Sequence, residues 1–372
     1  MNSVDLSRLD KITVITSVNI NTYKLYMRKV SRLLFIFLAV LCFELPAFSQ
    51  QDAQFSHYMF NSMYYNPGYA GLEGNTRFTG IFRKQWLGYS STSDAPGGTS
   101  PTSAVRTAST LLPFFKKSTG AGLNFLYDSK GPINTTELQL SLAYHFKIKT
   151  GKLGVGLRSG FRYENLNSNW YNVIDQDDPI YVSLKSSPSN QMKADIAAGL
   201  YWQTPKYYIG ISASHFTGTK YTYGIDTSIA SKLSSHLYAT AGYTFNLSGG
   251  MIKLTPNAFF QTDTKNYTYL FGAMVTYNDK FYGGVSTRQS IANREVTQGG
   301  NTIANDDIIF LIGMNFMKNN AMRVGYSFDY VTSGSQAKTK TSHEIMLSYV
   351  IPSPWLAAKP IVRTPRYRQE EY

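Results

Sequence analysis

Residues 237–247 alternate between two kinds of side chain, and this alternation limits what the chain can fold into. The odd-numbered positions are mostly large and apolar: Leu237, Ala239, Ala241, Tyr243, Phe245 and Leu247. The even-numbered positions are mostly small or polar: Tyr238, Thr240, Gly242, Thr244 and Asn246. Successive side chains of a β-strand point to opposite faces, so the pattern predicts a two-faced strand. Its length of about ten residues is what a tilted strand needs to cross a bilayer.

The composition agrees with a membrane environment. Charged residues make up only 16% of the 372 residues, and aromatic residues make up 15%. Soluble domains carry roughly 25% charged residues. No run of about twenty apolar residues is present, so the sequence predicts no membrane-spanning helix. Because only helices and closed barrels pair every backbone group in lipid, we predict an all-β protein, an antiparallel up-and-down outer-membrane β-barrel.

Similar alternation recurs along the chain and predicts fourteen strands, although it also permits twelve or sixteen. Charged side chains fall on the polar faces, as expected if the other face meets lipid, where a charge at mid-depth costs about 2–4 kcal/mol. The first two strands and the boundary near Pro205 are the least well defined. The predicted strands are residues 75–87, 102–112, 119–129, 134–148, 152–165, 191–204, 206–217, 234–247, 250–262, 266–278, 280–289, 306–317, 320–331 and 341–351.

The connections between these strands alternate in length. The even-numbered connections are short: 113–118, 149–151, Pro205, 248–249, Asp279 and 318–319. Most odd-numbered connections are longer: 88–101, 166–190, 218–233, 290–305 and 332–340. Outer-membrane barrels have short periplasmic turns and longer outside loops. The alternation therefore supports an even strand number and predicts that both termini are periplasmic.

The N-terminus has the order of parts expected of a secretory signal peptide. Residues 28–32 are basic, residues 33–43 are all apolar, and residues 47–49 are mostly small. We predict that residues 1–49 are removed by cleavage near Ser49 and Gln50, with Met27 as a candidate true start; an uncleaved anchor is the alternative. The only cysteine, Cys42, lies in this segment, so the mature chain would lack a thiol nucleophile.

The chain carries a net charge of +13. Removing residues 1–49 takes away six basic and three acidic residues and leaves +10. This excess could favour anionic lipid headgroups or an acidic partner, or it could reflect scattered lumen and loop charges. The basic tail 352–372 either docks a periplasmic partner or has no binding role.

No residue pattern points to catalysis, a metal, a cofactor or nucleic acid. The five histidines form no His-x-His or His-x-x-x-His pair, and no Ser–His–acid grouping is evident. Asp175, Asp177 and Asp178 could bind calcium, but they lack a glycine-hinged ligand spacing, which favours a solvated acidic loop. Basic residues do not cluster with aromatic ones as in nucleic-acid binders. We therefore predict a protein that is not an enzyme.

The segment after the predicted cleavage site carries a recognisable signature. Residues 51–61 read Gln-Asp-Ala-Gln-Phe-Ser-His-Tyr-Met-Phe-Asn, and residues 65–71 read Tyr-Asn-Pro-Gly-Tyr-Ala-Gly. Residues 83–86 read Arg-Lys-Gln-Trp, a Pro- and Thr-containing loop spans 96–101, and residues 342–349 read Ser-His-Glu-Ile-Met-Leu-Ser-Tyr. Over residues 50–351 the chain resembles the PorP/SprF family of Bacteroidetes. This chain has Ala53 where the family pattern has a proline, and Gly68 where it has an alanine.

The resemblance implies an outer-membrane barrel of the type IX secretion and gliding machinery. Such a barrel would help export, or retain at the cell surface, a secreted client protein or adhesin, in contact with outer-membrane lipid and secretion components. The candidate partner-binding residues are those of the matching motifs: Gln54, Phe55, Tyr58, Met59, Phe60, Asn61, Tyr65, Asn66, Pro67, Tyr69, Arg83, Gln85, Trp86, His343 and Glu344.

The signature segment also has a physical interpretation of its own. Residues 54–69 are rich in aromatic residues and methionine, and an apolar segment of this kind is unfavourable in water. We expect residues 50–74 to form a plug or docking platform in the mouth or lumen of the barrel (75–351), with a turn at 66–68. A cap on the periplasmic rim that serves stability alone is the alternative.

A competing function is a diffusion porin or solute transporter. Several charged residues on the polar faces could line a pore or pair across a closed interior: Arg158, Arg162, Glu164, Arg323 and Asp329. A cell-surface hydrolase with one essential serine is a third possibility.

Overall fold

The structure is a computed structural model that describes residues 52–88, 100–114, 118–167, 177–179, 182, 185, 190–222, 231–263, 266–292, 303–332 and 341–351. The predicted signal peptide, the C-terminal tail and Asp175 lie outside these residues. No helix in the described part is long and apolar enough to cross a membrane.

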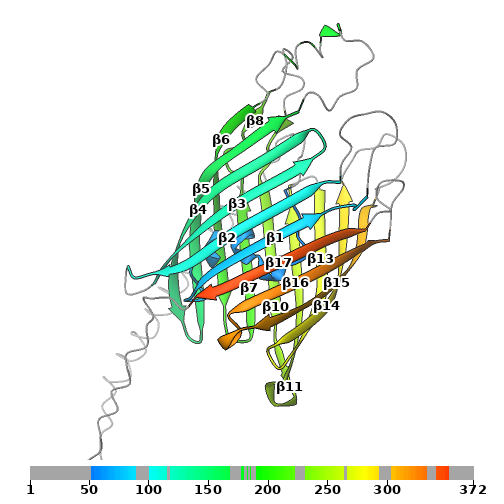
Figure 1. The fold of residues 1–372 in the computed structure, drawn as a ribbon. Coiled ribbons are helices and arrows are strands. Elements are labelled where there is room, and N and C mark those ends of the chain that lie inside the picture. The colour runs from blue at the N-terminus through cyan, green and yellow to red at the C-terminus, as the bar shows by residue number, and fades with distance from the viewer. Residues whose placement is uncertain are drawn as a thin grey trace, which may run out of the picture. The chain divides into compact units, whose positions relative to one another are not determined.

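Fourteen antiparallel strands form a closed barrel (Figure 1), which confirms the predicted fold class and strand number. The wall strands are β1 Thr76–Lys84, β2 Thr102–Leu112, β3 Thr119–Lys130, β4 Ile133–Ile148, β5 Gly151–Leu166, β6 Asn190–Gln203, β7 Tyr207–Ser214, β10 His236–Tyr243 with β11 Phe245–Leu247, β12 Ile252–Thr262, β13 Asn266–Tyr277, β14 Phe281–Ala292, β15 Ile303–Phe316, β16 Met322–Val331 and β17 Ser342–Ile351. A small ladder of β8 Lys220–Tyr221 and β9 Ser231–Lys232 lies between β7 and β10.

Each wall strand pairs with its neighbour in sequence, and β1 pairs with β17 to close the ring. β10 and β11 pair with β12 in one continuous register, so they are one strand interrupted at Thr244. Pro256, which has no N–H to donate, lies opposite this interruption in the register. The predicted strand 206–217 ends earlier, at Ser214, because His215 adopts a positive φ of 59°.

Side chains alternate between the lipid face and the lumen as predicted. Outward residues are apolar and exposed, for example Leu157 at 65% and Ile312 at 63%. Inward residues include polar and charged side chains that are fully buried, for example Glu164 and Glu344. This inside-out distribution is what a barrel in hydrocarbon requires.

The two ends of the barrel differ. The short connections after β2, β4, β6, β11, β13 and β15 share one end with the first residue of β1 and the last of β17. By the rule for outer-membrane barrels this short-turn end is periplasmic. The opposite, long-connection end holds the longer β1–β2, β5–β6, β7–β10, β14–β15 and β16–β17 connections.

Residues 52–74, here called the luminal segment, lie inside the barrel (Figure 1). The segment contains η1 Tyr58–Phe60, α2 Ser62–Tyr65 and η2 Pro67–Tyr69. It starts beside His215 and His236, at the long-connection end, and it leaves at the short-turn end into β1. The strands begin and end at the short-turn end, as expected, but residue 52 lies at the opposite end. The luminal segment therefore runs the length of the lumen.

Candidate functional site

The backbone of the luminal segment is shaped by local hydrogen bonds. Asn66 precedes η2, and its Oδ1 accepts a hydrogen bond of 2.8 Å from the Gly68 N–H. Pro67 then supplies a φ suited to the first helical position. The Asn66 Nδ2 donates to the carbonyls of Leu200 and Ile211, at 2.9 and 3.0 Å. One side chain thus forms the predicted turn and attaches it to β6 and β7.

Inward-facing glycines allow the segment to approach the wall. A Cβ on Gly154 would lie 2.0 Å from the Gly68 carbonyl oxygen. A Cβ on Gly120 would lie 1.9 Å from the Ala70 carbonyl oxygen. Backbone atoms cannot move aside cheaply, so these positions need glycine to seat the segment.

The first group of charges around the segment is the Ser56 clasp, made of Ser56, His57, Arg83, Arg288, Asp307, Asp329 and Glu344. The Glu344 carboxylate accepts the Ser56 and His57 N–H groups, each at 2.8 Å, and lies 2.6 Å from His57 Nδ1. Ser56 Oγ donates to Asp329 at 2.7 Å.

The arginines of the Ser56 clasp join it to the wall. Arg83 NH1 lies 2.7 Å from Asp329 and 2.9 Å from Ser56 Oγ. Arg288 bonds Asp307 at 2.9 Å and Ser56 Oγ at 2.9 Å. Every member is at most 8% exposed. Removing one partner of such a buried pair leaves an uncompensated charge, so the clasp is expected to hold residues 56–57 firmly.

The second group is the Asp52 clasp, made of Asp52, Glu137, Arg162, Glu164, Asp195, His215, His236 and Tyr238. Asp52 Oδ2 lies 2.9 Å from His215 Nε2 and accepts a hydrogen bond from the Tyr238 hydroxyl. Arg162 pairs with Glu137 and lies 3.7 Å from Asp52. The start of the segment is thereby joined to β4, β5, β7 and β10.

His215 lies just beyond β7, between two carboxylates. Its Nε2 faces Asp52, and its Nδ1 lies 3.1 Å from Asp195. Burial lowers the pKa of His215, but the Asp52 charge and hydrogen bonds to Asp195 and Asp52 together raise it to about 10. His215 is therefore an imidazolium at neutral pH.

Asp52, His215 and His236 also have their donor atoms within 4.8 Å of one another, as a metal site would. The sequence pattern did not predict this cluster, because the fold brings together residues far apart in the chain. Each residue has a hydrogen-bond role: His215 binds Asp52, and His236 Nε2 faces the Asp52 N–H at 3.3 Å. These bonds account for the arrangement, and we assign no metal to it.

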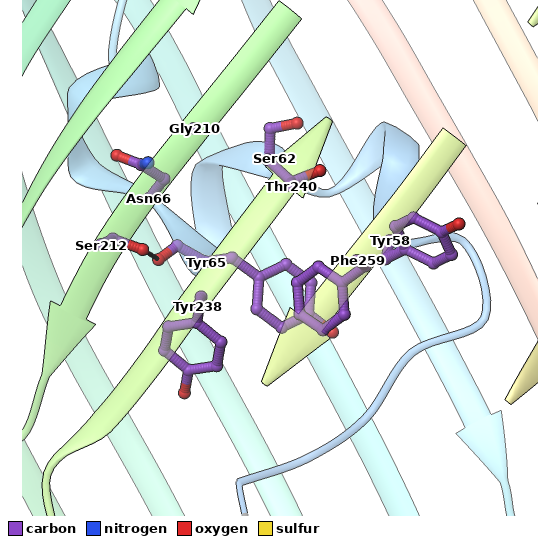
Figure 2. A pocket seen from close by; sticks show the side chains of 9 residues that line it. All are labelled: Tyr58, Ser62, Tyr65, Asn66, Gly210, Ser212, Tyr238, Thr240 and Phe259. Carbon is purple, nitrogen blue, oxygen red and sulfur yellow. Dashed lines mark hydrogen bonds between the residues drawn. The ribbon is translucent and has the colours of Figure 1, made fainter. Parts of the chain in front are cut away.

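The middle of the segment is held through its carbonyl groups and its aromatic rings. Arg158 donates to the carbonyls of Met63 and Tyr64, at 2.6 and 2.7 Å. The Tyr65 ring lies 4.6 Å from Phe259 between centroids, and Figure 2 shows the two rings together. The cavity beside them is about 10 Å³, room for about one water molecule.

The structure places most of the candidate partner-binding residues inside the barrel. The luminal-segment candidates are buried or half-buried: Gln54, Phe55, Tyr58, Met59, Phe60, Asn61, Tyr65, Asn66, Pro67 and Tyr69. Gln85 and Trp86 follow β1 at the long-connection end and are half-buried. The Trp86 N–H donates to Ser342 Oγ at 3.1 Å.

His343 and Glu344 are neighbours in sequence but point to opposite faces. Glu344 points inward to the luminal segment, whereas His343 points outward and lies 2.6 Å from the Tyr326 hydroxyl. Strand alternation therefore separates two residues that the motif presents together.

Some of the residues that hold the segment were not singled out by the sequence. Ser56, Asp52 and Arg288 carry most clasp contacts. Several of these contacts join residues more than 150 positions apart: Ser56 with Asp329, Asp52 with His215, and Arg288 with Ser56. The inward charges predicted to pair do so for Arg162 and Asp329, whereas the Arg323 guanidinium lies 4.3 Å from the Phe60 ring centroid.

Residues 47–349 match the family described as Type IX secretion system membrane protein PorP/SprF. The chain belongs to the PorP/SprF family. The predicted resemblance is confirmed, and this PorP/SprF protein is an outer-membrane β-barrel associated with type IX secretion. No curated protein matches the chain.

Solved structures similar to this PorP/SprF chain are outer-membrane proteins. The Acinetobacter baumannii outer membrane protein Omp33 is 10% identical, with 76% of this chain and all of Omp33 covered and a TM-score of 0.39. A TodX deltaS2S3 mutant monoaromatic hydrocarbon channel is 11% identical, with 78% and 93% covered and a TM-score of 0.47. A Pseudomonas aeruginosa FadL homologue is 12% identical, with 74% and 90% covered and a TM-score of 0.41.

Proposed function

We propose that this PorP/SprF protein is a non-enzymatic barrel that helps export a secreted client protein or retain it at the cell surface. The observation that carries the proposal is the luminal segment, which occupies the lumen and is bonded to the wall from one end to the other. A lumen filled in this way suits a binding scaffold better than an open pore.

The long-connection end is the face that we propose for the client. Trp86 and Gln85 lie there, beside the end of β1, and the adjoining Leu87 is 48% exposed. Large half-exposed side chains at the outer mouth are suited to anchoring a protein partner. The Ser56 clasp lies next to Gln85 and Trp86 on the luminal side, because its member Arg83 precedes Gln85 by two residues in the chain.

The main experiment is client display and co-purification from native outer membranes. Replacing Trp86 and Gln85 with alanine is expected to reduce the client at the cell surface while the barrel stays folded, as judged by its heat-dependent migration in gels. Phe114, exposed at the opposite end, supplies the matched control Phe114→Ala. Unchanged display in the double variant would contradict the proposed face.

Two measurements separate the proposed role from its alternatives. Planar-bilayer recording should show no steady conductance; an open channel would favour the porin. Deleting residues 52–70 tests the segment itself. Lost display from a folded barrel would support docking, and a lost barrel would show that the segment serves stability.

A further inference from the structure

The outward face of β2 differs from that of the other wall strands. Its outward residues are Thr102, Ala104, Arg106, Ala108, Thr110 and Leu112. Large apolar side chains are absent from the first five of these positions. By contrast, the outward positions of β4 include three successive leucines, Leu138, Leu140 and Leu142, each more than 50% exposed.

Arg106 lies on this face near mid-depth. The Arg106 side chain is exposed, and it is the fifth of eleven residues in β2. Because a tilted strand crosses the bilayer in about 9–11 residues, this position is close to the middle of the membrane. Among the outward-facing strand residues whose burial is described, it is the one Asp, Glu, Lys or Arg more than two residues from a strand end. Its register partners are Gly80 on β1 and Phe125 on β3.

A groove of about 490 Å³ follows β2 at this point. Gly80 and Ala108 form its floor, and nothing lies within 4 Å of where a Gly80 side chain would begin. Phe78 and Leu123, both exposed, border it. The Arg106 guanidinium lies over the Phe125 ring, 5.8 Å from its centroid. That distance is near the limit of a cation–π interaction.

We infer that the β1–β3 groove docks a membrane-embedded segment of another protein, one that places a carboxylate against Arg106. A guanidinium at mid-depth in hydrocarbon is unfavourable, and a carboxylate is the group that matches it best. Lipid phosphates lie at the membrane surfaces, not at mid-depth. The small floor residues let a partner backbone come close, as in other membrane-protein contacts.

The described outward positions of a second copy do not supply the required group. Among the strand residues whose burial is described, no Asp or Glu side chain faces outward. Two copies meeting at this groove would bring two arginines together without a counter-charge, which is repulsive. We therefore commit to a different protein as the occupant, and the crosslinking experiment separates it from a second copy.

Site-specific photo-crosslinking in native outer membranes tests the inference. A diazirine amino acid in place of Ala108 should give one discrete protein adduct. The same group in place of Ser159, an outward mid-strand residue of β5 flanked in register by Leu140 and Ile196, should give none. Mass spectrometry should place the crosslink in a membrane-embedded segment that contains Asp or Glu.

Dependence on the charge completes the test. Arg106→Leu should reduce the adduct at least tenfold, Arg106→Lys should retain most of it, and Arg106→Glu combined with Lys in place of the partner's acidic residue should restore it. The Arg106→Leu barrel itself should keep the heat-stability of the parent protein in detergent, because the change removes a charge from the lipid face. If it does not fold, Arg106→Met takes its place.

Three outcomes would overturn the inference. An adduct of twice the protein mass, formed also by the purified protein, would mean a second copy. Equal absence of adducts at positions 108 and 159 would mean that lipid covers the groove. An adduct of unchanged yield in Arg106→Leu would mean that the contact does not depend on the guanidinium.

Discussion

The Ser56 clasp predicts that substitutions at two adjacent residues of β17, Glu344 and His343, lower the free energy of unfolding by very different amounts. Glu344 accepts three hydrogen bonds from Ser56 and His57 and lies 3.5 Å from Arg83, all without solvent access. Glu344→Gln keeps the shape but removes the charge and turns an amide N–H₂ toward buried donors. Removing one partner of a buried ion pair costs about 3–5 kcal/mol, and we expect a loss of that size in the free energy of unfolding.

The control is His343→Gln, one residue away and on the lipid face. His343 contacts Tyr326 and Thr341, so its replacement should cost no more than about 1 kcal/mol, the usual value of one hydrogen bond. Both variants can be compared by reversible urea unfolding in detergent micelles. Equal losses in the two variants, or a Glu344→Gln loss below about 1 kcal/mol, would refute the argument that Glu344 anchors the segment.

Three further predictions concern other contacts of the luminal segment. Gly154→Ala should lower the free energy of unfolding by about 1–3 kcal/mol, because the new Cβ would lie 2.0 Å from the Gly68 carbonyl oxygen. Gly80→Ala, with nothing within 4 Å of the new Cβ, should change it by less than about 0.5 kcal/mol. Equal unfolding midpoints of the two variants would contradict this prediction. Arg158→Met leaves two buried carbonyls without their donor, so it should cost about 2–5 kcal/mol and expose residues 63–64 to protease, unlike Lys147→Met at the exposed Lys147. An unchanged digestion pattern would argue against the role of Arg158. Because the pKa of His215 is raised to about 10, its contribution to the free energy of unfolding is complete below the unfolded-state pKa near 6.5 and is lost as the pH rises through about 10. The difference in free energy of unfolding between the parent and His215→Gln should therefore decrease from pH 7 to pH 10.5. A difference that increases over this range would contradict the argument.

Most of the wall could be predicted from the sequence because its physical signal is local. In β4 and β5, each of sixteen residues, most outward positions are large and apolar and most inward positions are polar or glycine. β2 is the exception, since small residues dominate both of its faces, with Ser103, Thr107 and Ser109 inward and Thr102, Ala104, Ala108 and Thr110 outward. Alternation alone therefore does not show which face of β2 meets lipid, or that Arg106 lies on that face.

The candidate site could be predicted only in part. Aromatic content and motif residues pointed to the luminal segment and to Arg83 and Glu344. The partners of Ser56 come from one side of the ring, and those of Asp52 come from the opposite side. No local pattern in the sequence specifies which inward charges meet. The inward glycines of β5 were visible in the sequence, but the reason for them, contact with Gly68, appears only in three dimensions.

The Ser56 clasp also has a consequence for the biogenesis of the protein. Arg83 on β1 and Glu344 on β17 are register partners at the seam where the sheet joins itself, and both contact Ser56. The ring thus encloses a piece of its own polypeptide, and the β1–β17 ladder that closes the ring also binds that piece. A chain that reached the membrane with residues 56–57 misplaced would bring these groups together unsatisfied. Placement of residues 56–57 in the lumen and closure of the barrel therefore depend on the same side chains, Arg83 and Glu344.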